Sequence, residues 1–206
     1  RTAKGTPVVN IIEKSPEEKI SEIIPVKEFS DNEYLVMVTK NGVIKKTPAS
    51  EYESIRKSGK IAITLKEGDE LISIFKTTGN DNIFLATRNG MAICFNENDA
   101  RAVGRTASGV KAIDLADGDY VVGAEPVRED SKVLLVTDGG YGKCTDLTSF
   151  RIQHRGGKGL KAYKITEKTG NIIGISMVND SEELIMVTSE GVVIRIRIKD
   201  IATTTG

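Results

Sequence analysis

The sequence has no tryptophan, a single histidine, two cysteines and no long apolar run. Without eighteen consecutive apolar residues, the sequence predicts no membrane-spanning helix. The absence of tryptophan excludes the WD40 repeat signature. His154 has no second candidate metal ligand near it in the sequence, and the acidic residues form no convergent pair. We therefore expect no metal site and no catalytic residue in this chain.

What the sequence does contain is a repeat of about fifty residues. Four Thr-x-x-Gly segments recur at this interval, at Thr39–Gly42, Thr87–Gly90, Thr137–Gly140 and Thr188–Gly191. A second glycine keeps the same period at Gly59, Gly109 and Gly159, and Gly5 precedes them. Self-similarity at this period is typical of propeller blades and related arrays, so function is to be sought in what the repeats share.

Each repeat has the pattern of short strands joined by turns. In the first complete copy, the apolar run Tyr34–Val38, an Asn41-Gly42 turn and the run Val43–Thr47 predict a β-hairpin. A polar connector follows, and after it an acidic turn at Gly68-Asp69. Further strands are expected at Ile61–Leu65 and Leu71–Phe75, and within residues 8–12, 20–26, 83–95, 110–122, 133–145, 160–175 and 184–198.

No segment shows a sustained 3.6-residue apolar period, so we predict a chain that is nearly all β. Two hairpins in each repeat amount to a four-stranded blade. We expect complete blades at about 34–82, 83–132 and 133–183, with partial blades at 1–33 and 184–206. The chain begins without methionine or an apolar signal segment, so we expect it to be a piece of a longer protein.

Charge is sorted by position in the repeat, although 29 basic and 29 acidic residues cancel overall. The spans 1–5, 56–60, 101–111 and 151–161 contain basic residues and no acid, and each includes one of the second glycines. The acids collect in turns at 67–70, 114–119 and 180–183. This sorting predicts one basic outer rim, with the acidic turns away from it.

The two cysteines occupy equivalent places in successive repeats, each seven residues after the turn threonine. Equivalent positions on neighbouring blades are too far apart for a disulfide. Cys94 and Cys144 are therefore expected to be free thiols in a reducing compartment, without chemistry of their own.

One segment resembles a known family motif. Gln153-His154-Arg155-Gly156-Gly157-Lys158-Gly159 is similar to the Gln-Arg-Arg-Gly-Gly-Lys-Gly heptad of the DNA gyrase C-terminal domain family, with His154 replacing the first arginine. Residues 1–12, 41–47, 104–111 and 140–143 also look typical of this family, so the resemblance covers essentially the whole chain. In gyrases the defining heptad lies in the first blade, upstream of the loop matching residues 1–5, so the copy here belongs to a later blade.

The resemblance implies a β-pinwheel, a propeller-like ring whose neighbouring blades exchange strands and whose basic rim wraps double-stranded DNA. Arginine forks, lysine charges and glycine N–H groups would meet phosphates without reading sequence. The candidate DNA-binding residues are Arg1, Lys4, Arg56, Lys57, Lys60, Arg101, Arg105, Lys111, Arg151, Gln153, His154, Arg155, Gly156, Gly157, Lys158, Gly159 and Lys161. Lys45, Lys46, Lys143, Arg195, Arg197 and Lys199 either extend the rim or form polar faces of half-exposed strands.

By the same resemblance, we expect a non-catalytic domain that supports ATP-dependent negative supercoiling by a bacterial, cytoplasmic and nucleoid-associated enzyme. ATP and Mg²⁺ would be used elsewhere in that enzyme, whose partners would be the gyrase B subunit and a second gyrase A subunit in an A2B2 assembly. One alternative is the corresponding domain of topoisomerase IV, and another is a propeller-type protein interaction module. The salt dependence of DNA affinity distinguishes the interaction module from the two DNA-binding domains, because DNA binding through phosphates weakens steeply as salt rises.

Overall fold

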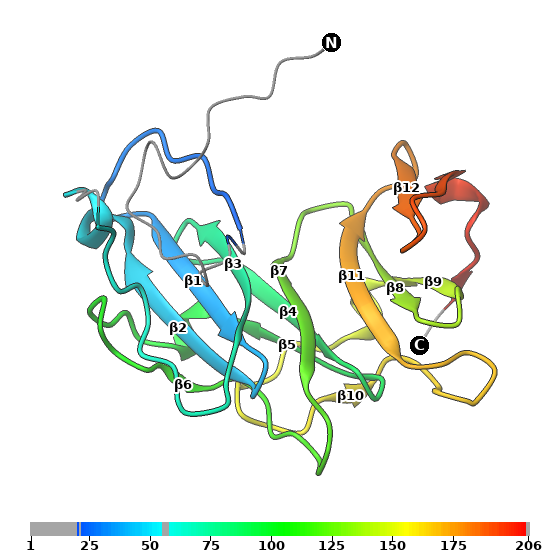
Figure 1. Ribbon diagram of the computed structural model, residues 1–206, viewed down its shortest axis with the longest axis horizontal. Coiled ribbons are helices and arrows are strands. Elements are labelled where there is room, and N and C mark those ends of the chain that lie inside the picture. Colours follow the sequence, from blue (N-terminus) through cyan, green and yellow to red (C-terminus); the bar gives the residue numbers. More distant parts are fainter. Residues whose placement is uncertain (1–19, 21, 55–57, 205–206) are drawn as a thin grey trace.

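The computed structural model describes residues 20, 22–54 and 58–204, which form three four-stranded sheets and a final hairpin. Figure 1 shows the first sheet on the left, the second in the centre and the third on the right, with the hairpin above the third. The strands are β1 (Tyr34–Thr39), β2 (Val43–Pro48), β3 (Leu71–Thr77), β4 (Asn82–Thr87), β5 (Met91–Asn96), β6 (Val110–Lys111), β7 (Val121–Pro126), β8 (Lys132–Thr137), β9 (Gly142–Asp146), β10 (Leu160–Lys161), β11 (Ile172–Val178), β12 (Glu183–Val187), β13 (Val193–Arg197) and β14 (Thr203–Thr204). Short 3-10 helices, η2 (Ala49–Tyr52), η3 (Glu97–Asp99), η4 (Leu147–Ser149) and η5 (Ile198–Asp200), follow the hairpins.

Neighbouring repeats exchange strands, as the family resemblance implied. The sheet orders are β3-β1-β2-β6, β10-β5-β4-β7 and β11-β8-β9-β14, with β12-β13 as the separate hairpin. Strand β6 follows β5 in the chain but pairs with β2, and β10 follows β9 but pairs with β5. Each of these repeats therefore gives a short strand to the sheet before it. The second hairpin expected in each repeat is wrong for the same reason, because β6 and β7, like β10 and β11, lie in different sheets. The all-β pinwheel prediction is confirmed, while the division into blades at the stated residues stays a prediction.

The Thr-x-x-Gly segments form the hairpin turns because both ends of the motif have a structural role. Gly42 has a φ of +78°, a left-handed conformation that favours glycine, and its N–H donates to the Thr39 carbonyl at 3.0 Å. The Thr39 hydroxyl accepts from the Val43 N–H at 3.2 Å. The same hydroxyl contact recurs from Met91 to Thr87, from Tyr141 to Thr137 and from Val192 to Thr188.

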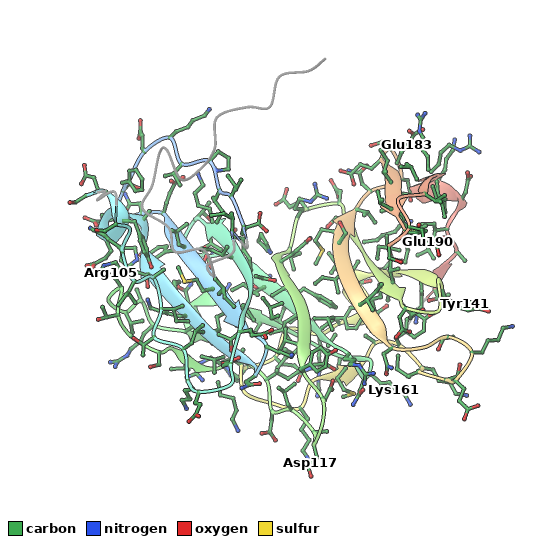
Figure 2. The ribbon with its side chains drawn as sticks, viewed as in Figure 1. Arg105, Asp117, Tyr141, Lys161, Glu183 and Glu190 are labelled. Carbon is green, nitrogen blue, oxygen red and sulfur yellow. The ribbon has the colours of Figure 1, made fainter. Side chains whose placement is uncertain are left out.

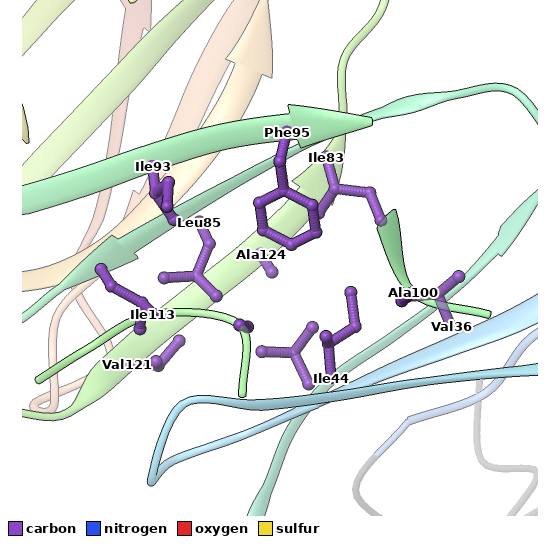
Figure 3. Close-up of a cluster of buried hydrophobic side chains, with 12 residues drawn as sticks. Val36, Ile44, Ile83, Leu85, Ile93, Phe95, Ala100, Ile113, Val121 and Ala124 are labelled. Carbon is purple, nitrogen blue, oxygen red and sulfur yellow. The ribbon is translucent and has the colours of Figure 1, made fainter. Parts of the chain in front are cut away.

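The cores lie between successive sheets. Figure 3 shows the first, in which Val36 and Ile44 of one sheet face Ile83, Leu85 and Phe95 of the next. A second cluster, containing Phe84, Phe150 and Met177, joins the second and third sheets, and a third lies under the final hairpin. Because both faces of the inner strands are covered, β1 and β4 are almost entirely buried. Burial of this apolar surface is what holds one repeat against the next.

Two predicted strands are wrong within the described residues. Ile61–Leu65 and the described part of Ile20–Val26 have no strand assignment. Their counterparts β6, β10, β3, β7 and β11 all pair with a hairpin strand. The described chain contains no hairpin ahead of β1, so these two segments lack a partner, and a strand without a partner leaves its backbone groups unpaired. The strand expected at 8–12 lies outside the described residues.

Over residues 20, 22–54 and 58–204, no helix is both long enough and apolar enough to cross a membrane.

Candidate nucleic-acid interface

Two loops carry most of the described candidate residues. We call residues 101–111 the first basic loop and residues 151–161 the second basic loop. Both lie on the returning segment of the preceding repeat through contacts that recur fifty residues apart. The Arg105 guanidinium donates to the Ile61 carbonyl at 2.6 Å, and that of Arg155 donates to the Lys111 carbonyl at 2.9 Å.

A second pair of contacts recurs in the same way. The Thr64 N–H donates to the Ala107 carbonyl at 3.3 Å, and the Asp114 N–H donates to the Gly157 carbonyl at 2.9 Å. The two basic loops therefore occupy equivalent positions, each on the edge of its own neighbour. This arrangement supports the predicted common edge for the clusters at Arg105 and Arg155.

The candidate side chains divide by exposure. The exposed residues are Lys60, Arg101, Lys111, Arg151, His154, Lys158 and Lys161. Partly buried are Arg105, Gln153, Arg155, Gly156, Gly157 and Gly159. Arg1, Lys4, Arg56 and Lys57 lie outside the described residues. Exposed cations are available to phosphates, whereas the partly buried residues are also engaged with the protein itself.

The second basic loop is held by Asp99, at the end of η3. One oxygen of the Asp99 carboxylate lies 3.1 Å from the Arg155 N–H and 3.1 Å from Nδ1 of His154. The Asp99 backbone carbonyl accepts from Nε of Arg155 at 2.8 Å. The Gly156 N–H donates to the Ala112 carbonyl at 2.6 Å, so the expectation that this N–H meets phosphate is wrong. Sequence reasoning missed Asp99, because this residue lies outside the acid-free span.

The acidic turn at 114–119 lies beside the basic loops rather than away from them. Nζ of Lys111 is 2.8 Å from an oxygen of Asp114, and this ion pair lowers the pKa of the exposed Asp114 carboxyl. Lys158 lines a cavity of about 420 Å³ together with Asp114, Asp117 and Asp119. Figure 2 shows Asp117 on the same side of the molecule as Lys161. The prediction that this turn lies away from the rim is therefore wrong, because folding brings together residues that the sequence separates.

Some acids of these turns have a structural role that explains their positions. Asp69 accepts from the Asn41 N–H at 2.9 Å, and Asp119 accepts from the Asn89 N–H at 3.0 Å. Each carboxylate thus caps a hairpin turn of its own repeat, which satisfies a backbone donor. Asp119 also accepts from the Thr87 hydroxyl at 2.6 Å.

Two of the predicted rim extensions are not at the surface. Lys45 and Lys46 are buried within β2, with 1% and 4% of their surfaces exposed. The Lys45 ammonium donates to the carbonyls of Ala62 and Arg105, and that of Lys46 pairs with buried Glu97. The prediction that Lys45 and Lys46 extend the rim is therefore wrong. Both faces of β2 are packed against other parts of the protein, so the strand has no half-exposed side.

The remaining rim candidates lie nearer to solvent. Lys143 is partly buried and donates to the Ala162 carbonyl at 3.2 Å. Arg195, Arg197 and Lys199 are exposed. Arg195 pairs with Glu183, and Nε of Arg197 lies 2.7 Å from Asp200, which raises the pKa of Arg197.

The buried Lys45 predicts a pH dependence of stability. Burial, and then the charge of Arg105, lower the pKa of Lys45 from 10.5 to about 8. Because the unfolded chain binds the proton more tightly between these values, the contribution of Lys45 to stability should increase as pH rises from 8 to 10. The unfolding free energy of the wild type, minus that of Lys45→Met, should therefore grow by about 1 to 3 kcal/mol over this range. Denaturant unfolding of both proteins at pH 7, 8, 9 and 10 measures this difference in unfolding free energy. A difference that does not change with pH would contradict the lowered pKa of Lys45.

The sequence of this chain matches a known protein family. A family model described as "DNA gyrase C-terminal domain, beta-propeller" matches residues 33–78, 81–128, 131–179 and 182–206. The DNA gyrase A subunit from Clostridium acetobutylicum is 52% identical over 204 residues, covering 99% of this chain and 25% of that protein. Its counterpart from Halalkalibacterium halodurans is 56% identical over 204 residues, covering 99% and 24%. The chain thus spans about a quarter of the length of these relatives.

Solved structures agree on the fold. A C-terminal domain of DNA topoisomerase IV superposes with a TM-score of 0.90 at 30% identity, covering 97% of this chain and 63% of that one. A DNA gyrase A C-terminal domain superposes with a TM-score of 0.87 at 25% identity, covering 98% and 68%.

Proposed function

Because the chain belongs to the DNA gyrase C-terminal domain family, we propose that it binds duplex DNA along its basic loops and bends the duplex around the edge they form. The observation that most supports this proposal is that the two basic loops contact the preceding repeat in equivalent ways. Each loop also presents exposed lysine or arginine side chains. Phosphate contacts of this kind hold a duplex in place without reading its sequence. The array is then one wrapping domain, with blades at about 34–82, 83–132 and 133–183 and partial blades at either end.

In the whole enzyme, the proposed role is to fix the handedness with which DNA is presented, so that ATP-dependent strand passage gives negative supercoiling. The chain itself would cut no DNA and hold no cofactor, with ATP and Mg²⁺ used elsewhere. The partners proposed are duplex DNA, the gyrase B subunit and a second gyrase A subunit in an A2B2 assembly of the bacterial cytoplasm and nucleoid. The clusters at residues 1–5 and 56–60 would continue the same edge.

Gyrase is favoured over topoisomerase IV, because the curated relatives at 52% and 56% identity are DNA gyrase A subunits. The likeness to a topoisomerase IV domain reflects the shared fold. A protein interaction module is the remaining alternative, and it does not require the recurrent cationic loops.

The proposed function predicts a steep loss of DNA affinity with salt. Each phosphate neutralised contributes about −0.9 to the slope of log affinity against log salt. Replacing Lys158 and Lys161 together by alanine should flatten that slope by up to about two and weaken all sequences alike. Fluorescence anisotropy with a labelled duplex over a salt series measures both quantities.

A matched control is Lys66→Ala, which removes the same charge from an exposed lysine beside the acidic turn at 67–70. This variant should leave the salt slope unchanged. If the wild type binds no duplex, or binds it with an affinity that does not depend on salt, the DNA-wrapping function is refuted and the interaction module is favoured.

A further inference from the structure

Resting on the proposed DNA-binding function, we infer that Arg155 and Asp99 are positioning residues of the second basic loop. In this assignment the Arg155 guanidinium is a brace within the protein rather than a phosphate ligand. The pair fixes the loop so that exposed neighbours, His154 and Lys158, face the duplex.

The Arg155 side chain is engaged on two sides. Its Nε donates to the Asp99 carbonyl at 2.8 Å, and its Nη1 donates to the Lys111 carbonyl at 2.9 Å. Two of the three guanidinium nitrogens thus bind carbonyls of two elements, η3 and β6. The planar guanidinium holds these two nitrogens apart at a fixed spacing, so each meets its own acceptor. A lysine ammonium is a single point at the end of a flexible stem and binds two carbonyls only where both lie around that point, as at Lys45.

One of these two contacts recurs in the first basic loop. Arg105, fifty residues earlier, donates to the Ile61 carbonyl at 2.6 Å, at the position equivalent to Lys111. There the loop is also held by Lys45, which donates to the Arg105 carbonyl. In both loops, an arginine guanidinium therefore donates to a backbone carbonyl at the equivalent position. A structural role requires such a contact, whereas binding a phosphate does not.

Asp99 is otherwise hard to explain on a surface that binds DNA. Its carboxylate lies 3.1 Å from the Arg155 N–H, and 24% of its side-chain surface is exposed. A negative charge beside a phosphate chain weakens binding, so an acid here must have a compensating use. Accepting from the loop backbone supplies that use. His154, bonded to the same carboxylate, keeps 96% of its side chain exposed.

These assignments make predictions of opposite sign for two variants that lose the same charge. Asp99→Asn keeps an acceptor oxygen for the Arg155 N–H and should bind duplex DNA about two- to threefold tighter, because it removes repulsion. Asp99→Ala removes the acceptor as well, and should bind about tenfold more weakly, because an ordered loop is lost. If Asp99 acted only through its charge, both variants would bind more tightly.

A second comparison addresses the arginine. Arg155→Lys keeps the charge but not the fork, so it should lose about as much affinity as Arg155→Ala, roughly tenfold. Lys158→Arg serves as the control, since a phosphate contact at that position tolerates either cation and should stay within about twofold of the wild type. A near wild-type affinity for Arg155→Lys would overturn the brace.

Hydrogen exchange of the free protein gives a readout that does not depend on DNA. The amides of Arg155 and Gly156 should exchange faster in Asp99→Ala and Arg155→Lys, and at the wild-type rate in Asp99→Asn and Lys158→Arg. If the wild type fails to bind DNA, the proposed function fails while exchange still tests the brace. If DNA binding is normal but these amides do not respond, the brace alone fails.

Discussion

Replacing Gly109 by alanine is expected to destabilise the protein by roughly 2 to 5 kcal/mol, combining a left-handed backbone cost with a steric clash. Gly109 has a φ of +88°, and a Cβ added there would lie 2.5 Å from the Ile44 carbonyl oxygen. That carbonyl belongs to β2, which pairs with β6 just after Gly109. The clash can be relieved only by moving one strand from the other. Denaturant unfolding measures the loss.

Gly59→Ala is the matched control. Gly59 has the equivalent place in its repeat and a φ of +73°, but no described atom lies within 4 Å of the position its Cβ would take. Its loss should be the backbone cost alone, about 1 to 2 kcal/mol. Equal losses in the two variants would show that the approach to β2 does not require glycine. Gly159, whose added Cβ would meet the Ala92 carbonyl, should follow Gly109.

The sequence predicts local turns of this fold better than strands that need a distant partner. The first hairpin of each repeat is predicted correctly, because its turn is local and the threonine and glycine of the motif lie three residues apart. The second expected hairpin is wrong, because the strands on either side of its acidic turn belong to different sheets. The segment Ile61–Leu65 has apolar residues like those of its counterparts, yet it is no strand. Strand formation there depends on a partner strand from another repeat, which the segment's own residues cannot indicate.

The candidate site was predictable where residues reach solvent and less so where charge is buried. Lys158 and Lys161 are exposed on the second basic loop, as expected. Lys45 and Lys46 are expected from the sequence either to extend the rim or to lie on the polar face of a half-exposed strand, because charged residues are mostly exposed, but both faces of β2 are covered. Asp99 reaches the loop across 56 residues of chain, a tertiary contact for which no spacing rule exists.

The buried Lys46 leads to the second large effect, at its partner Glu97. Replacing Glu97 by alanine is expected to cost about 3 to 5 kcal/mol, because it leaves a buried ammonium without its counter-charge. Nζ of Lys46 lies 3.3 Å from Oε2 of Glu97, whose side chain is fully buried. The other carboxylate oxygen accepts from the N–H groups of Gly79 at 2.9 Å and Asp81 at 2.7 Å. Thermal or urea unfolding of the variant measures the loss.

The later repeats provide a control that separates the charge from these backbone contacts. At the positions equivalent to Lys46 and Glu97, the next interface has Cys94 and Leu147, which pack in one apolar cluster. The double variant Lys46→Cys with Glu97→Leu should therefore be more stable than Glu97→Ala alone by about 2 kcal/mol or more, since no unpaired charge stays buried. The amides of Gly79 and Asp81 are only partly buried, so water can replace the lost acceptor. If the double variant is as unstable as Glu97→Ala, the stabilising role of Glu97 lies in holding the 79–81 turn, and the ion pair contributes little.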